Sequence, residues 1–414
     1  MRHRQNHYIF VFCIILKIFL QFSPALDYRA SASINFPLLI FLYTYIFSLC
    51  RNIAWKKLCT FLPIYIAPFL NVYSNVWGNL PIANLLYLIL QWLIWPLVAF
   101  FAVEHLSNKS QRFIVVSFFI CFAITALTTF LGCLIYPDAA RSQANGNFAE
   151  TNPELLALYR SMNIGSFLFV YTVVPMLPLL LYSLRTKLYN KWLVGCILIL
   201  LSVTIYKTQY ATAFLIGLIA CIFLLLPLRL TAKNIKKRLI GIIVLSILCI
   251  PIFALFFDIL AENVESEILS QRFQEISSFF NNDTSLEEDS DLGVRFQLWT
   301  GSFKGFLEHP ITGCYIWGKE ETMKWLGGHS FILDMMCKWG ILGLFLVILM
   351  FKSIYKLFIL PYKNQPIYVY AYVAYWINIV QCLVNTTTAE IIFVFLIPLL
   401  ILGNKKQEIK YSYK

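Results

Sequence analysis

Long apolar runs, rather than alternating polar and apolar positions, dominate this chain of 414 residues. Many of the runs reach the roughly 17–25 residues that a helix needs to cross the hydrocarbon core of a bilayer. The strand-like alternation that is typical of outer-membrane barrels is not found. The pattern therefore predicts an all-α polytopic integral membrane protein with about twelve transmembrane helices, at residues 8–23, 34–50, 58–74, 81–102, 113–135, 161–183, 192–206, 210–228, 240–257, 330–351, 366–384 and 390–403.

Composition supports a membrane protein, because 59% of the residues are hydrophobic and only 13% are charged. Soluble domains carry about a quarter charged residues. The net charge of +12 could indicate nucleic-acid binding, but the basic residues follow the predicted topology instead. With the N-terminus inside, the inner segments hold 22 of the 33 Lys and Arg residues and the outer segments hold 9. This positive-inside bias predicts that both termini are cytoplasmic and that the partner is the lipid bilayer, not nucleic acid.

Two outer segments, residues 136–160 and 258–329, are too long to be simple connections. The second one divides the chain into residues 1–257 with nine helices, the large outer loop 258–329, and residues 330–414 with three helices and a basic tail. Long loops usually carry function, and the short inner loops show no nucleotide-binding glycine pattern. Chemistry is therefore expected on the outer face, where the energy for forming a bond has to arrive with the substrate.

Two amphipathic helices are predicted within the large outer loop. Residues 268–280 repeat apolar side chains at helical spacing, which suits a helix that lies on the bilayer surface. Residues 292–308 form the second helix and place Arg295 four residues before Trp299, on the same face. Pro310 ends this helix.

The stretch Gly327-Gly328-His329-Ser330 immediately precedes an apolar run and so marks the outer end of a helix. Free N–H groups and the helix dipole favour an anion there, and two glycines allow a close backbone approach. Gly327 and Gly328 are therefore candidates for a diphosphate seat, with a neutral His329 beside it and with Arg295 and Lys324 as nearby cations. A simple glycine turn followed by an interface histidine accounts for the same spacing equally well.

Four short motifs follow one another in a fixed order: Gly293-Val-Arg295-Phe-Gln-Leu-Trp299, Glu308-His309-Pro310-Ile-Thr-Gly313, Gly328-His329-Ser330 and Gly340-Ile-Leu-Gly343. Together they resemble the signature of the O-antigen ligase and Wzy-type O-antigen polymerase superfamily. The resemblance implies a GT-C-like membrane enzyme of the bacterial inner membrane with one large periplasmic loop. It also implies a glycan donor carried on undecaprenyl diphosphate, with no cofactor and no metal ion.

The resemblance assigns roles to individual residues. Arg295 would bind the lipid diphosphate, and His329 would activate the acceptor hydroxyl or orient the diphosphate, so these two are the predicted catalytic residues. One feature departs from the family, which often carries a Ser-Arg pair at the opening of the helix that corresponds to 210–228. This chain has Lys207-Thr208-Gln209 there, so the second cation is predicted to come from Lys207, Arg160, Arg272 or Lys324. A lysine that snorkels at a helix end explains Lys207 at least as well.

The resulting prediction is a polymerase that joins lipid-linked oligosaccharide repeat units into O-antigen, capsular polysaccharide or exopolysaccharide. A chain-length regulator and a flippase are its expected protein partners. The first alternative is an O-antigen ligase that transfers glycan to the lipid A-core of lipopolysaccharide. The alternative from another class is a polysaccharide flippase or transporter, although no repeat between the two halves and no pair of broken helices is evident.

Two further groups are assigned structural roles. The eleven cysteines show no paired spacing and lie mostly within the apolar spans, so no structural disulfide is predicted and only Cys314 is placed outside. Asp334 and Lys338 lie four residues apart within a predicted span and are expected to neutralise each other.

Overall fold

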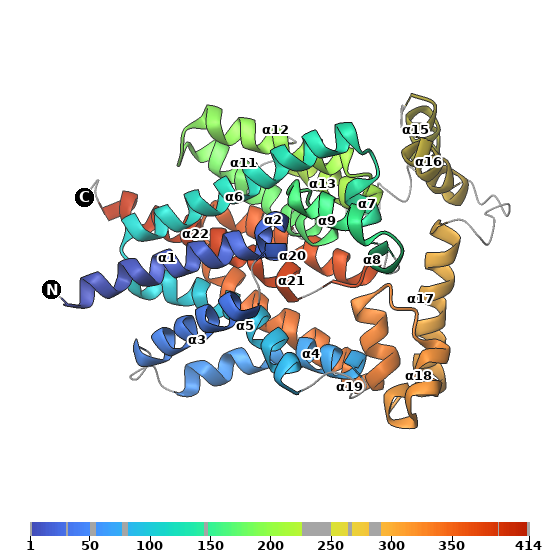
Figure 1. The fold of residues 1–414 in the computed structure, drawn as a ribbon, viewed down its shortest axis with the longest axis horizontal. Helices are drawn as coiled ribbons and strands as arrows, with labels where there is room; N and C mark the ends of the chain where they lie inside the picture. Colours follow the sequence, from blue (N-terminus) through green and yellow to red (C-terminus); the bar gives the residue numbers. More distant parts are fainter. Residues whose placement is uncertain are drawn as a thin grey trace. The chain divides into compact units, whose positions relative to one another are not determined.

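The computed structural model describes residues 2–29, 32–49, 55–76, 82–144, 148–225, 250–263, 267–280, 291–387 and 389–411. Every regular element in these residues is a helix (Figure 1). Four helical segments are long and apolar enough to cross a membrane, and six shorter helices are also apolar. The predicted all-α polytopic membrane class is therefore confirmed. The number of twelve spans stays a prediction, because part of the expected span 240–257 lies outside the described residues.

The chain forms two compact units. Unit 1 contains residues 1–226, 349–379 and 387–414, and unit 2 contains residues 227–348 and 380–386. The helices of unit 1 are α1 (Arg2–Phe22), α2 (Pro24–Arg29), α3 (Ala32–Leu49), α4 (Trp55–Val76), α5 (Ile82–His105), α6 (Asn108–Ile135), α7 (Ala139–Ser142), α8 (Phe148–Thr151), α9 (Pro153–Ser161), α10 (Phe167–Val173), η2 (Val174–Met176), α11 (Leu177–Thr186), α12 (Lys191–Lys207), α13 (Ala211–Leu225), η4 (Tyr355–Ile359), η5 (Leu360–Tyr362), α21 (Ala389–Val394) and α22 (Leu396–Tyr411).

Helix α6 organises unit 1, because α1, α12 and α22 all pack against it. It begins after Ser107, whose hydroxyl oxygen caps the helix by accepting the N–H of Ser110 at 3.3 Å. Near its other end, the hydroxyl of Thr129 accepts the N–H of Gly165 at 2.7 Å and so fixes the turn before α10. Figure 1 places the start of α1 and the end of α22 at the same end of unit 1.

The predicted first outer segment, residues 136–160, folds back over the end of α6 together with the turn that follows it to residue 166. It contains α7, α8 and α9, which close over a small apolar core formed by Cys133, Ala139, Ala140, Tyr159 and Ile164. The predicted helix 161–183 starts later than expected, at Phe167. Asn163 explains the delay, since it adopts a left-handed conformation with φ of 60°. Its side-chain oxygen accepts the Ser23 hydroxyl at 2.7 Å, which holds the turn against the start of α2.

Unit 2 holds the second outer segment and the helices beside it. Its elements are α15 (Ile250–Asn263), α16 (Glu267–Phe280), α17 (Asp291–Glu308), η3 (Cys314–Trp317), α18 (Lys319–Trp325), the first part of α19 (Phe331–Ile354) and the last turn of α20 (Ile367–Val384). Helices α16 and α17 confirm the two helices predicted at 268–280 and 292–308. Helix α15 continues past the predicted end at residue 257 and packs against α16, with the rings of Phe257 and Phe273 stacked at 5.9 Å.

Helix α19 is broken at Gly340, where φ is 60° and ψ is −143°. The apolar helical segment runs over residues 331–362, and a straight helix of this length would measure about 48 Å, against about 30 Å for a hydrocarbon core. Side chains up to Gly340 are mostly buried, whereas an exposed apolar series starts directly after it, at Ile341, Leu342, Phe345 and Ile348. Asp334 and Lys338 lie in the buried part that precedes Gly340. The candidate span found in the structure covers residues 331–362, so it starts next to the predicted start at residue 330.

Candidate functional site

The Gly-Gly-His-Ser stretch forms the turn between α18 and α19, as the sequence predicts. Ser330 caps α19, because its hydroxyl oxygen accepts the N–H of Leu333 at 3.1 Å. The same hydroxyl donates to the carbonyl oxygen of Cys382 at 3.4 Å, near the end of α20. The N–H of Phe331, the first residue of α19, donates to the carbonyl oxygen of Asn385 at 3.1 Å. The start of α19 is thus fixed from two sides.

The carboxylate of Asp334 holds this turn through hydrogen bonds. One carboxylate oxygen accepts the hydroxyl of Ser302 at 2.8 Å and the N–H of Gly328 at 3.2 Å, and the other accepts the N–H of Ser330 at 3.3 Å. The side chain is 2% exposed, so these donors compensate for the loss of water around the carboxylate. Lys338 lies within electrostatic range of Asp334, as predicted, but the hydrogen bonds of the carboxylate go to Ser302 and the turn.

The two glycines have a structural task in this arrangement. The N–H of Gly327 donates to the hydroxyl oxygen of Ser302 at 2.9 Å, and that of Gly328 donates to Asp334. A side chain at residue 327 would overlap the backbone of Leu298, and Gly328 has φ of +71°. An anion could bind these two N–H groups only if both internal hydrogen bonds opened. Diphosphate binding by Gly327 and Gly328 therefore stays a prediction that the hydrogen bonding does not favour.

His329 is half-buried. A hydrogen bond holds its backbone, but none from a described residue holds its ring. The carbonyl oxygen accepts the indole N–H of Trp299 at 3.3 Å, but the imidazole has no hydrogen-bond partner among the described residues. Burial lowers the pKa of His329 below its usual value, the positive charge of Arg295 lowers it further, and Asp334 opposes both effects. A lowered pKa favours the neutral imidazole, which is the form that can accept a proton. Burial is the largest cause of the lowered pKa.

Arg295 lies close to His329 and comes from α17. Its guanidinium donates to the side-chain oxygen of Asn385 at 3.2 Å. The N–H of Asn385 in turn donates to the carbonyl oxygen of Gln381 at 2.8 Å, which continues the hydrogen bonding of α20. The hydroxyl of Thr386 donates to the carbonyl oxygen of Gly328 at 2.9 Å. Asn385 and Thr386 were missed by the sequence argument, because nothing in the local pattern separates them from ordinary loop residues.

The His-Pro and Gly-Ile-Leu-Gly motifs meet at the break in α19. The N–H of Ile341 donates to the carbonyl oxygen of Pro310 at 2.7 Å, so the turn after α17 inserts where α19 is interrupted. Gly313 and Gly340 both have positive φ, and a side chain at either position would overlap the backbone of the other segment. Cys337 contacts Cys314 in the same region, with the two sulfur atoms 3.9 Å apart. The sequence had placed only Cys314 outside the membrane, and this neighbour was not predicted.

Lys324 belongs to a separate surface cluster around Glu321. The carboxylate of Glu321 accepts the indole N–H of Trp325 at 2.7 Å and pairs with His309 at 3.3 Å and with Lys324 at 3.7 Å. The hydrogen bonds from Trp325 and His309 lower the pKa of Glu321. Since Lys324 already has a carboxylate partner and lies over the ring of Trp325, its predicted role in binding diphosphate has no direct support in this geometry.

Two of the other predicted cations lie in unit 1, and one is only partly described. Lys207 ends α12, directly before the α12–α13 junction, and its ammonium lies 6.0 Å from the ring centre of Tyr206. Arg160 lies within electrostatic range of Asp27. Arg272 lies on α16, but its side chain is outside the described part.

The structure adds Arg141 to the cations of unit 1. Its guanidinium donates to the carbonyl oxygen of Gln209 at 3.4 Å, in the junction where the family often has a Ser-Arg pair. Gln209 itself is 4% exposed and has φ of 60°, which is uncommon for a residue other than glycine. In the sequence, Arg141 stands out only as a basic residue of the first outer segment. Its position in that long loop was the one signal that could have indicated a role in the site.

Residues 194–348 match a protein-family model described as O-antigen ligase. This confirms the predicted resemblance to the O-antigen ligase and polymerase superfamily. Members of the family are glycosyltransferase-like enzymes of lipid-linked glycans in membranes. The matched region of the O-antigen ligase family contains Lys207, Arg295 and His329 but not Asn385. Comparison with curated proteins gives no match.

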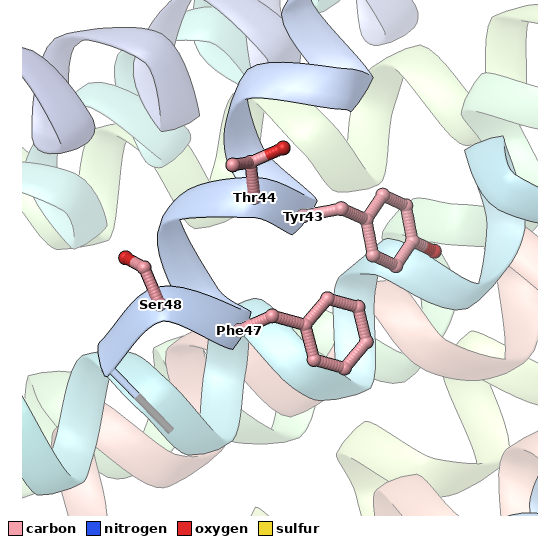
Figure 2. Close-up of a pocket in the computed structure, with 4 residues that line it drawn as sticks. All are labelled: Tyr43, Thr44, Phe47 and Ser48. Carbon is pink, nitrogen blue, oxygen red and sulfur yellow. The ribbon is translucent and has the colours of Figure 1, made fainter. Parts of the chain in front are cut away.

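A pocket found in the described residues lies away from Arg295 and His329 in the sequence. It is a hollow of about 480 Å³ along α3 in unit 1. Its lining residues, Tyr43, Thr44, Phe47 and Ser48, are drawn in Figure 2, and none of them is charged. No group of three or more His, Cys, Asp or Glu side chains that could hold a metal ion occurs within the described ranges.

Proposed function

We propose that this protein is the polymerase that joins oligosaccharide repeat units carried on undecaprenyl diphosphate. The reaction takes place on the periplasmic face of the bacterial inner membrane and makes O-antigen, capsular polysaccharide or exopolysaccharide. The observation that carries the proposal is the half-buried imidazole of His329 within electrostatic range of the guanidinium of Arg295, which is itself held by Asn385. The match to the O-antigen ligase family supports the same class of reaction.

The two side chains suit the two charge changes of a glycosyl transfer from a lipid diphosphate. A hydroxyl oxygen of the acceptor sugar attacks the anomeric carbon of the donor glycan, and the bond from that carbon to the diphosphate oxygen breaks. The imidazole of His329 takes the proton of the attacking hydroxyl. The diphosphate leaves with the bonding electron pair, and Arg295 stabilises its added negative charge. The energy of the broken bond comes with the donor, so no nucleotide is needed.

Arg295 needs support from a second cation, because a leaving diphosphate carries several negative charges. Lys207, Arg160 and Arg141 in unit 1, together with Arg272 and Lys324 in unit 2, are the residues to test for this role. Arg141 has the advantage of a planar guanidinium that binds phosphate oxygens in pairs, whereas Lys207 offers a point charge. No step of the proposed reaction uses a metal ion. We therefore expect the protein to stay active in the presence of a metal chelator.

An O-antigen ligase is the second candidate, since the matching family model is described by that activity. Both enzymes use the same donor and differ in the acceptor. For the polymerase the acceptor is an incoming lipid-linked repeat unit, and for the ligase it is the lipid A-core.

Deletion of the gene, followed by electrophoresis of the surface glycan, distinguishes the candidates. For the polymerase we expect surface glycan that stops at a single repeat unit. Full-length polymer that stays on its lipid carrier would show a ligase instead. Loss of every surface repeat unit would show a flippase, the transporter alternative.

A further inference from the structure

We infer that Asn385 is a positioning residue that holds the guanidinium of Arg295 in place without cancelling its charge. The inference rests on the proposed function, since it takes Arg295 as the group that binds the lipid diphosphate. Asn385 is 4% exposed, and its side-chain oxygen accepts a hydrogen bond from Arg295 at 3.2 Å. The two residues lie 90 positions apart in the sequence, so only the fold brings them together.

The backbone of Asn385 is fixed independently of Arg295. Its N–H donates to the carbonyl oxygen of Gln381 at 2.8 Å, and its own carbonyl oxygen accepts the N–H of Phe331 at 3.1 Å. Phe331 is the first residue of α19 and follows the turn that carries His329. One residue therefore sets the position of Arg295 and of the helix start beside His329, which keeps the two groups in register.

The chemical identity of this acceptor matters as much as its position. A carboxylate would bind the guanidinium more strongly than an amide, but it would also neutralise the charge and compete with the diphosphate. The amide oxygen accepts the hydrogen bond and leaves the positive charge intact. Arg295 also lowers the pKa of His329 through its charge, so a neutral holder preserves this effect as well.

The side-chain nitrogen of Asn385 indicates that asparagine is not the most stabilising residue at this position. The side-chain nitrogen of Asn385 is buried and has no hydrogen-bond partner among the described residues. A buried N–H without an acceptor is destabilising. Aspartate at this position would remove that donor and form an ion pair with Arg295. Stability alone therefore favours aspartate, and retention of the positive charge on Arg295 is the property that asparagine adds.

The test compares Asn385→Asp with Arg295→Ala in purified protein. Aspartate keeps every acceptor that Asn385 uses and adds one negative charge. We expect Asn385→Asp to fold with a thermal midpoint equal to or above that of the wild type. Its affinity for undecaprenyl diphosphate, the probe ligand, should fall roughly 10–100-fold, the size of one lost charge-assisted hydrogen bond. Polymerisation at subsaturating donor should fall by a similar factor.

The matched control is Asn152→Asp, which makes the same chemical change at an exposed residue of unit 1. It should bind and polymerise like the wild type. The double variant Arg295→Ala with Asn385→Asp should be no worse than Arg295→Ala alone, because Asn385 acts through Arg295. A purely structural role would instead give additive losses together with a lower thermal midpoint.

Three results would each overturn a different part of the two proposals. Wild-type affinity in Asn385→Asp, with Arg295→Ala inactive, would remove the positioning role and leave the proposed function standing. Wild-type activity in Arg295→Ala would remove Arg295 from the site and with it the basis of both proposals. If Asn385→Asp does not fold, Asn385→Ala replaces it. This variant leaves Arg295 charged but not held, so undiminished donor affinity in the folded alanine variant would also overturn the inference.

Discussion

The two outer segments of this protein are held together by different forces. The first, residues 136–160 with the turn that follows to residue 166, folds around a small apolar core that includes Tyr159 and Ile164, and the side chain of Gln143 donates to the carbonyl oxygens of Ala139 and Ile164. In the second, residues 258–329, the part from α17 to the start of α19 is held by the buried carboxylate of Asp334 and the amide of Asn385. Apolar packing is enough to close a loop, but it is not directional. The polar network of the second segment fixes the direction of a guanidinium and the position of an imidazole.

The polar network of the second segment carries an energetic cost. A buried carboxylate is stable only while its hydrogen-bond donors remain in place, so each substitution around Asp334 leaves a charge without compensation. In the apolar core of the first segment, by contrast, losing a methyl group leaves only a small cavity. Substitutions around Asp334 and Asn385 should therefore affect activity most, and substitutions in the apolar core of the first segment should affect stability alone.

The largest effect is expected at His329. His329→Ala removes the proposed base, and turnover should fall by roughly the 10²–10⁴-fold that is typical of a lost general base, while the lipid-linked donor still binds. His329→Gln should be equally slow if the ring accepts a proton, and should keep appreciable activity if the ring only orients the diphosphate. Purified protein with lipid-linked repeat units, followed by product length over time, measures both. Normal turnover in a well-folded alanine variant would make His329 an ordinary interface residue.

Arg295 should come second. Arg295→Lys keeps the charge but loses the planar fork and the hydrogen bond to Asn385 in its present geometry, so activity should fall roughly 10–100-fold. The measurement is the initial rate at several donor concentrations, which separates donor binding from turnover. A lysine variant with the wild-type dependence on donor would show that a point charge is sufficient, and would contradict the role given to the guanidinium.

The pH dependence gives a smaller and more specific signal. A base has to be neutral, and burial together with Arg295 lowers the pKa of His329 below its usual value of about 6.5. The rate should therefore be constant through neutral pH and should decline only as the pH falls through this lowered pKa. If protonated His329 bound the diphosphate instead, the rate would rise over the same interval. The profile of Arg295→Ala should shift its acid limb toward higher pH, because one of the two causes of the lowered pKa is removed.

Hydropathy predicted most of the fold, because a bilayer leaves few alternatives to apolar helices. Spacing also located α16 and α17, and the order of the motifs pointed to Arg295 and His329, which the structure places within electrostatic range of each other. Asn385 could not be found in this way, since its partner lies 90 residues away and the pairing depends on how α17 and α20 pack. The motif that begins at Gly340 was recognised in the sequence, but the break of α19 at this residue was not predicted from it. Its conformation depends on the insertion of the Pro310 turn, a long-range contact that local sequence does not encode.

The smallest effect is expected from Ile164→Val, in the apolar core of the first segment. Ile164 is fully buried and packs against Gly132, so removing one methylene should lower the free energy of unfolding by about 0.5–1.5 kcal/mol. Thermal unfolding followed by tryptophan fluorescence measures this loss in detergent. Activity per folded molecule and donor affinity should stay at wild-type values, because the apolar side chain of Ile164 takes no part in the proposed binding of the diphosphate. A drop in donor affinity without a matching loss of stability would show that the first segment also positions the substrate, and the contrast between the two outer segments would then be wrong.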